Sequence, residues 1–274
     1  MSVDQPPKSS LVDLLLRSDK RKKLLLLLTE GPKRIDEITE VLDAPATSVL
    51  PQVKKLKENG LVLQDGKTYK LSKIGLIVTE KMQPLVGTLE VFEDHFDYWT
   101  ERDLTGIPPS LRVNLGKIGS CRLIEPKLSR IFEPPEEFVD NLLKSGEVMR
   151  FTSYFQPSFK SIHDIVIRNK AAVSLIVTSG FFERVVSDHP EELDKFLRPE
   201  NSKLFIFNGS TTLASLTVTE RFMALLLPDK RGKLDQRLLL SFEEKAIEWG
   251  KEMFLHLLDQ SREVTGENLE ELKK

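Results

Sequence analysis

A group of hydroxyl, amide and lysine side chains lies on a helix predicted over residues 46–59. Val49, Val53 and Leu56 recur at helical spacing, so they are expected to face a core. The residues expected on or near the outer side are Ala46, Thr47, Ser48, Pro51, Gln52, Lys54, Lys55 and Lys57. In a recognition helix, a glutamine amide can bind adenine with both its ends, hydroxyls contact bases or phosphates, and lysines contact phosphates. The alternative is the solvated face of a purely structural helix.

A hairpin is predicted directly after this helix. Two short apolar runs, residues 61–64 and 68–71, flank Asp65-Gly66, and glycine accepts the positive φ that a tight turn needs. The hairpin offers Lys67, Thr68 and Lys70 to phosphates or to the minor groove, although charged tips also keep ordinary hairpins in solution. Upstream, the basic run 20–23 begins a helix, where the helix dipole disfavours it. A phosphate partner would offset that cost, and a solvated face is the alternative.

The elements before this helix complete a recognisable order. Helices are predicted over 19–30, which ends at Gly31, and over 34–42, and a short break at 43–45 separates the second from the helix at 46–59. Helix, helix, short turn, helix and hairpin is the order of a winged helix-turn-helix. We therefore expect residues 1–75 to form a winged helix-turn-helix DNA-binding domain.

Residues 76–103 are expected to form a helical connector. Its apolar stripe consists of Met82, Leu85, Leu89, Phe92, Phe96 and Trp99. Pro84 should kink or divide the helix, and residues 103–109 resemble a linker. The stripe is more apolar than a linker requires. It could pair two copies in a homodimer, which would place two recognition helices on one duplex, or it could pack on its own C-terminal domain.

Residues 104–261 are predicted to form an α/β domain with a partly parallel sheet, because strands and helices alternate. The predicted strands are 147–152, 172–178, 203–207, 213–218, 222–227 and 238–241. The predicted helices are 136–143, 158–169, 181–187, 191–197 and a closing helix over 242–261. The polar residues 262–274 are expected to be a disordered tail.

Polar residues at the ends of the first two central strands suggest a ligand site. In open α/β sheets, ligands bind outside the carboxyl ends of the strands, and helix N-termini there favour anions. The candidate effector-binding residues are Arg150, Ser153, Tyr154, Gln156, Ser158, Thr178 and Ser179. The alternative is that the serines only cap helices and the tyrosine fills the core.

Composition separates a basic from an acidic part. Residues 1–74 contain 14 Lys/Arg against 10 Asp/Glu, a net charge of +4, and the remainder contains 26 against 32, a net charge of −6. A basic N-terminal part agrees with a DNA partner. A single cysteine excludes an internal disulfide. With only one cysteine and four scattered histidines, we do not expect a structural zinc site.

The sequence lacks the usual signals for membranes, cofactors and catalysis. There is no membrane-length apolar run and no apolar leader, so we expect a cytoplasmic protein. There is no GxSxG, Walker loop or GxGxxG, so we expect no cofactor, metal or catalytic site. The pairs around His95 and His163 are interpreted as helix surface.

The two halves each resemble a known kind of regulator. The stretch GPKRIDEITEVLDAPATSVLPQVKKLKENGLVLQDGKTYKLSKIG resembles the winged helix of archaeal transcription regulators related to the ArsR group. FTSYFQPSF, AVSLIVTSGFFERVV, KLFIFNG, ASLTVTERFMALLL and FEEKAIEWGKEMF resemble the effector domain of regulators of methanogenesis and filament formation in methanogens. That domain is similar to the sensor of TrmB-type regulators, which resembles half of a phospholipase D fold.

The resemblance implies ligand sensing rather than catalysis. His163 is followed by Asp-Ile, which departs from the HxKxxxxD motif of active phospholipase D. The sequence therefore predicts an α+β/α/β protein: an archaeal regulator that binds double-stranded DNA as a homodimer and responds to an unidentified small molecule, with an anion favoured. One alternative is a phosphodiesterase-like enzyme whose winged helix serves as a localising module. Another is a winged helix used only for protein contacts.

Overall fold

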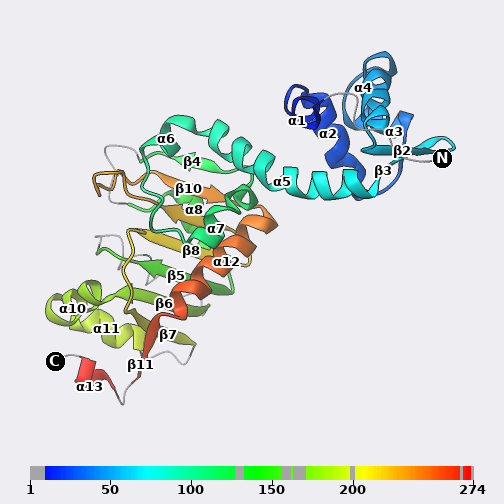
Figure 1. Cartoon of the computed structure of the whole chain (residues 1–274). Helices are drawn as coiled ribbons and strands as arrows, with labels where there is room; N and C mark the ends of the chain where they lie inside the picture. Colours follow the sequence, from blue (N-terminus) through cyan, green and yellow to red (C-terminus); the bar gives the residue numbers. More distant parts are fainter. Residues whose placement is uncertain are drawn as a thin grey trace. The chain divides into compact units, whose positions relative to one another are not determined.

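The computed structural model describes residues 10–126, 133–155, 162, 171–197, 201–265 and 268–272. The chain divides into two compact units, Met1–Val86 and Gly87–Lys274. The division lies inside helix α5 (Lys73–Asp94), within the stretch expected to be a connector. Figure 1 shows α5 running from one unit into the other. Each unit has a hydrophobic core of its own and is described separately.

Unit 1 combines short helices with a small sheet. In chain order its elements are α1 (Leu11–Leu16), α2 (Asp19–Leu27), a 3-10 turn (Leu28–Glu30), β1 (Lys33–Arg34), α3 (Ile35–Val41), α4 (Ala46–Glu58), β2 (Val62–Asp65) and β3 (Thr68–Leu71). The three predicted helices and the hairpin are confirmed. Helix α1 and strand β1 are additions; β1 pairs antiparallel with β3 and gives the strand order β1-β3-β2. A two-residue strand has no periodicity for sequence analysis to detect.

The break in the long helical stretch falls at a different residue from the one predicted. Helix α5 continues through Pro84, and regular structure is interrupted at His95, whose φ of −140° and ψ of 52° lie outside the helical region. Helix α6 (Phe96–Glu101) follows. His95 Nε2 lies 2.9 Å from the Cys121 carbonyl oxygen, so this histidine is tied to the protein rather than placed on a helix surface. Core packing on both sides of Pro84, by Met82 and Val91, sustains the helix across a proline that removes one hydrogen bond.

Unit 2 is built on an eight-stranded mixed sheet in the order β11-β7-β6-β5-β8-β9-β10-β4. Its strands are β4 (Arg122–Ile124), β5 (Glu147–Thr152), β6 (Ala172–Thr178), β7 (Ser202–Phe207), β8 (Ser215–Thr219), β9 (Met223–Leu226), β10 (Leu238–Ser241) and β11 (Ser261–Val264). Strands β5, β6 and β7 are parallel, and the other pairings are antiparallel. All six predicted strands are present, and the partly parallel sheet is confirmed.

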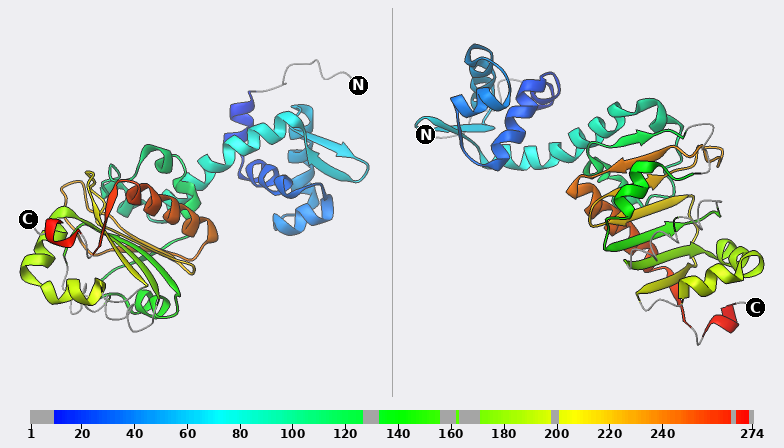
Figure 2. Two further views of the ribbon diagram at one scale, coloured as in Figure 1. Left: turned by 90° about the horizontal axis from the view of Figure 1, so that it is seen from below. Right: turned by 180° about the vertical axis from the view of Figure 1, so that it is seen from behind.

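Helices cover both faces of this sheet (Figure 2, left). One face packs on α12 (Glu244–Leu258) and on the segment containing α6, α7 (Pro109–Arg112) and the 3-10 turn Leu115–Ile118. Trp249 of α12 is fully buried, and its Nε1 donates to the Leu111 carbonyl oxygen at 3.0 Å. The other face packs on α8 (Glu136–Leu142), α10 (Ser179–Asp188) and α11 (Pro190–Leu197). The helix predicted over 158–169 lies outside the described residues, apart from Ile162.

The C-terminal segment corrects the expectation of a disordered tail beginning at 262. Residues Ser261–Val264 form edge strand β11, which pairs antiparallel with β7, and Val264 is buried. A short helix, α13 (Leu269–Leu272), follows. The segment is polar because an edge strand exposes most of its side chains, and its backbone bonds to β7 supply the order that composition does not reveal.

In the part of the chain that the structure describes, no helix is long and apolar enough to cross a membrane.

Candidate nucleic-acid interface

Helix α4 is oriented by the three residues that the sequence assigned to its inner side. Val49, Val53 and Leu56 are 1, 2 and 0 % exposed, and they belong to the same core as α2 and α3. This confirms the predicted stripe. Because a helix that buries one stripe must expose the opposite one, the remaining side chains of α4 face outward from the core of unit 1.

The predicted recognition residues lie where the stripe requires. Exposed positions on α4 are Ala46, Thr47, Pro51, Lys54, Lys55 and Lys57, while Ser48 and Gln52 are half-buried. Sequence analysis missed Leu50, which is 43 % exposed on the same helix. An apolar residue beside the buried stripe is easily assigned to the core, and only its exposure shows that it belongs to the outer surface.

The start of α4 differs from the starts of the two preceding helices. The Ser18 hydroxyl caps α2, and the Glu37 carboxylate accepts the Arg34 N–H at the start of α3. Helix α4 begins after Pro45 with no side-chain cap and no acidic residue in its first turn. The first N–H groups of a helix have no acceptor within the helix and carry partial positive charge. The start of α4 is therefore open to an anionic or acceptor partner.

Gln52 is held by a buried arginine from α2. Arg21 is 8 % exposed; its Nε donates to the Leu14 carbonyl oxygen and its Nη1 donates to Gln52 Oε1 at 2.8 Å. The run 20–23 is therefore not a single basic surface. Arg21 turns inward, while Lys22 and Lys23 pair with Asp19 at 3.4 and 3.0 Å. The sequence offered no signal for the Arg21–Gln52 contact, since the two residues are 31 positions apart.

The hairpin tip exposes only part of the predicted basic surface. Lys67 is exposed at the turn, where Gly66 has a φ of +56°. Lys70 is partly neutralised by Asp65, 3.0 Å away, and the Thr68 hydroxyl donates to the Asp65 carbonyl oxygen at 2.9 Å. Lys57 extends from α4 to the hairpin and donates to Gln64 Oε1 at 2.5 Å. Lys57 and Lys70 thus stabilise the hairpin, and Lys67 is the lysine of the three that lies at its tip.

A tight junction fixes the hairpin to α5. Ser72 Oγ donates to the Gly60 carbonyl oxygen at 2.6 Å and accepts the Gly75 N–H at 2.9 Å. A Cβ at Gly75 would lie 2.0 Å from the Leu61 carbonyl oxygen, so only glycine fits there. The LSKIG stretch at 71–75 is therefore explained by close backbone contact at the base of the hairpin.

In unit 2, two of the predicted effector residues meet where neighbouring strands end. Parallel pairing of β5 and β6 brings Ser153 and Thr178 together, and the Thr178 hydroxyl donates to the Ser153 carbonyl oxygen at 3.3 Å. Tyr154 Oη donates to Gln236 Oε1 at 3.4 Å. Ser179 is exposed as the first residue of α10. Gln156 and Ser158 lie outside the described residues.

Arg150 lies in the centre of this sheet, on β5. It is 6 % exposed and is placed by the strand register between Leu175 and Thr217. Burial lowers the pKa of Arg150 to about 10, and nearby Tyr154 acts in the opposite direction. Burial raises the pKa of Tyr154 in turn. Arg150 and Tyr154 therefore lie close together, and the arginine keeps its positive charge at neutral pH.

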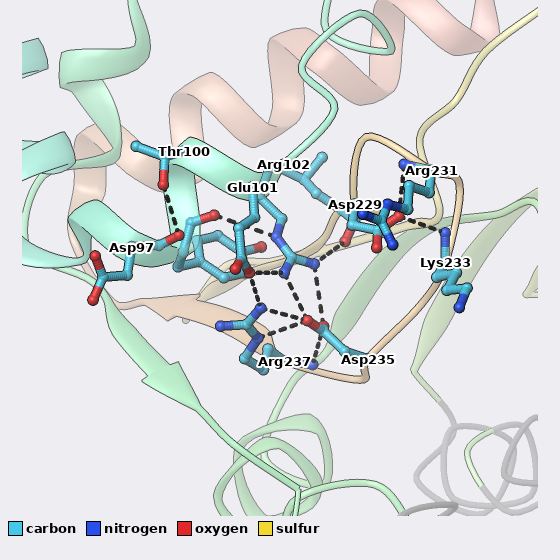
Figure 3. Close-up of polar contacts among 11 residues, drawn as sticks. Asp97, Thr100, Glu101, Arg102, Asp229, Arg231, Lys233, Asp235 and Arg237 are labelled. Atoms are coloured by element: carbon cyan, nitrogen blue, oxygen red, sulfur yellow. Dashed lines mark hydrogen bonds and ion pairs between the residues drawn. The ribbon is translucent and has the colours of Figure 1, made fainter.

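A second charged cluster in unit 2 satisfies its charges internally (Figure 3). Arg102, 2 % exposed, binds the Asp235 carboxylate through both terminal nitrogens, at 2.6 and 3.2 Å. Arg237 contacts Asp235 at 2.6 Å and Glu101 at 2.7 Å. The Arg102 guanidinium also lies 4.6 Å from the centre of the Tyr98 ring. This cluster fastens α6 to the segment before β10, which is a structural role.

Metal-ligating and nucleophilic side chains can be assessed in the described residues. Among them, no group of three or more His, Cys, Asp or Glu side chains is arranged to hold a metal ion. Burial raises the pKa of Cys121 to about 11, which keeps it a thiol at neutral pH. His163 and Asp164 lie outside the residues that the structure describes.

Two family models, both drawn from one kind of protein, match this chain. The N-terminal domain of methanogenesis regulatory protein FilR1 matches residues 10–90, and its middle domain matches residues 131–260. Over both stretches the chain is similar to the FilR1 regulators. This confirms the archaeal regulator resemblance inferred from the sequence.

One curated FilR1 relative aligns with most of this chain. Methanogenesis regulatory protein FilR1 of Methanothrix harundinacea (strain 6Ac) is 23 % identical over 260 residues. The alignment covers 92 % of this chain and 58 % of the relative, so the chain spans little more than half the length of that protein.

Two solved structures show weaker likenesses. TrmBL2, described as an archaeal chromatin protein with a novel mode of DNA binding, matches 89 % of this chain and 94 % of its own at 11 % identity, with a TM-score of 0.41. The phospholipase D family member Nuc from Salmonella typhimurium matches 54 % of this chain and 99 % of its own at 11 % identity, with a TM-score of 0.38. Both scores are too low for a conclusion about this chain.

Proposed function

We propose that this chain is a transcription regulator whose unit 1 is a winged helix-turn-helix that binds double-stranded DNA. Helix α4 would be the recognition helix and the β2–β3 hairpin the wing. The observation that carries the proposal is the exposed face of α4: it begins at an uncapped helix start, it is polar and basic, and three buried residues fix its direction.

Each kind of group on this face suits a part of the duplex. The hydroxyl of Thr47 and the first N–H groups of α4 can contact bases or phosphates, and Lys54, Lys55 and Lys67 can neutralise phosphates. Leu50 can contact the methyl group of thymine in the major groove. Lys57 and Lys70 would act mainly by supporting the wing.

A charge placed on α4 tests this proposal. In Thr47→Glu, the new carboxylate lies in the first turn, where the helix dipole favours it, so unit 1 should keep its stability. The carboxylate would repel phosphates, and we expect DNA affinity to fall by about tenfold or more. Ser110→Glu introduces the same charge into the first turn of α7 in unit 2, and it should bind like the parent. Fluorescence anisotropy with duplexes selected from a random library measures both, and equal loss in the two variants would contradict the assignment of α4.

We infer that the active form is a homodimer that uses the exposed apolar residues of α5. Met82 packs in the core of unit 1, and Val91 and Trp99 pack in the core of unit 2. Ile74, Ile77, Leu85 and Leu89 are instead 55, 59, 52 and 48 % exposed. Exposed apolar residues at helical spacing favour a helix partner. Sedimentation at micromolar concentration should give a dimer that Leu85→Glu dissociates, whereas a monomer in both the free and DNA-bound states would contradict it.

Unit 2 is proposed to sense a small anionic ligand near Arg150 and Tyr154. The buried guanidinium and the adjacent phenol support this, because a buried positive charge strengthens the binding of an anion. A thermal-shift screen of phosphorylated and carboxylated metabolites should find a compound that stabilises the parent chain but not Arg150→Met. A compound that stabilises both equally would place the ligand elsewhere.

A further inference from the structure

The amide of Gln52 has a defined orientation because its partner can only donate. A guanidinium has five N–H donors and no acceptor, so the atom of Gln52 that lies 2.8 Å from Arg21 Nη1 must be the carbonyl oxygen. The amide nitrogen of Gln52 makes no hydrogen bond within the described part of the chain. Contact with Arg21 therefore leaves Gln52 with two N–H donors for an external partner.

Arg21 is itself held from a second direction. Its side chain is buried, and its Nε donates to the carbonyl oxygen of Leu14, a buried residue of α1. Both of these acceptors, Leu14 and Gln52, are neutral. A cation bound to the amide oxygen also polarises the amide and strengthens its N–H groups as donors.

Gln52 lies beside the DNA-facing residues of α4. It follows Ser48 by four positions and precedes Lys55 by three, so the three residues share one row along the helix. Gln52 is half-buried, with its oxygen turned to Arg21. A two-ended contact with adenine needs the amide oxygen to accept from adenine N6, and the Arg21 contact already takes one of that oxygen's two acceptor positions and fixes its direction, whereas neither N–H donor of the amide is used.

We propose that Gln52 recognises a base as a hydrogen-bond donor, with guanine as the favoured partner through its O6 and N7 acceptors, and that Arg21 is the positioning residue that sets this orientation. The proposal rests on the DNA-binding function proposed above, and it replaces the adenine contact expected from the sequence. Arg21 is buried on the inner side of α4 and acts through its hydrogen bond to Gln52.

The decisive variant is Gln52→Glu. A carboxylate keeps an acceptor for Arg21, with added charge attraction, so unit 1 should melt at the parent temperature or above. It offers acceptors instead of donors to the duplex. Because a carboxylate accepts from cytosine N4, selection from a random duplex library should change one position of the preferred site from G·C to C·G. The parent should prefer G·C at that position by about tenfold.

Three further variants separate positioning from structure. Arg21→Met frees the amide to rotate and should relax the preference at that same position only, while Arg21→Lys retains a donor and should restore it. Gln64→Glu makes the same charge change on the wing, and it should weaken binding without changing any base preference.

The outcomes distinguish this inference from the proposed function. If the parent enriches no sequence and binds no duplex, both fail. If the parent enriches a site and Gln52→Glu keeps every base preference, Gln52 does not read a base as proposed. If Arg21→Met keeps the parent preference, Arg21 is not the positioning residue.

Discussion

Arg21 in unit 1 and Arg102 in unit 2 are both buried, yet their partners differ in charge. Arg102 is held by the Asp235 carboxylate, with Glu101 at 3.4 Å, so its charge is compensated inside the unit. Arg21 donates to two neutral oxygens. An arginine paired with carboxylates contributes mainly to holding elements together, whereas one with neutral partners leaves a positive charge beside the surface above it. In unit 1 that surface is α4.

The comparison predicts its largest effect at Arg102. Arg102→Met should destabilise unit 2 by about 2–4 kcal/mol, because it removes a buried guanidinium that makes charge-assisted hydrogen bonds to the half-buried Asp235 carboxylate, although Arg237 still pairs with Asp235. Trp99 and Trp249 are the two tryptophans of the chain and both lie in unit 2, so their fluorescence reports its unfolding in denaturant. Arg122→Met, which breaks an exposed pair with Glu137, should cost less than about 1 kcal/mol. Equal losses of stability in Arg102→Met and Arg122→Met would show that burial of the arginine does not matter.

Acidic pH should remove the stability that the Arg102–Asp235 ion pair contributes. Burial alone would raise the pKa of Asp235, but hydrogen bonds from Arg237 and Arg102 lower it below 3.8. A carboxyl group with a lowered folded-state pKa contributes stability above its unfolded-state pKa, and this is lost as the pH falls through the folded-state value. The stability difference between the parent and Arg102→Met should therefore shrink below about pH 4. A difference that stays constant down to about pH 2 would rule out the ion pair as its source.

Arg21 should matter less for stability. Arg21→Met removes hydrogen bonds to two neutral oxygens and leaves no carboxylate buried alone, so we expect a loss of about 1–2 kcal/mol. Hydrogen exchange of the backbone amides in α2 and α4 measures this loss of stability within unit 1. Lys23→Met, which breaks an exposed pair with Asp19, is the control and should stay within about 0.5 kcal/mol. A loss as large as that of Arg102→Met would remove the distinction between the two arginines.

The smallest effect is expected at the wing. Lys67→Ala should weaken specific and non-specific DNA binding about equally and reduce the slope of log affinity against log salt by about one. Unit 1 should keep its stability, since Lys67 is exposed at the hairpin tip. Lys144→Ala, an exposed lysine in unit 2, should leave the slope unchanged. If both variants share the parent slope, Lys67 does not contact a phosphate.

Much of the local structure was predictable. The six predicted strands of unit 2 and the helices α2, α3 and α4 of unit 1 follow from apolar periodicity and from glycine and proline signals, which act over a few residues. The inward stripe of α4 was predictable for the same reason. Pro84 does not divide α5, because core packing on either side preserves the helix, and β11 was missed because an edge strand carries a polar sequence.

The sequence by itself therefore determined most of the helices and strands, which face of α4 is buried, and the kind of regulator that the chain resembles. Tertiary structure alone decided what the buried arginines do. Arg21 meets Gln52 across 31 positions and Arg102 meets Asp235 across 133. The sequence around a basic residue does not show which residue it will contact, because its contacts depend on which elements the folded core brings together. Packing thus turned one residue of a basic run inward and fixed the orientation of the Gln52 amide.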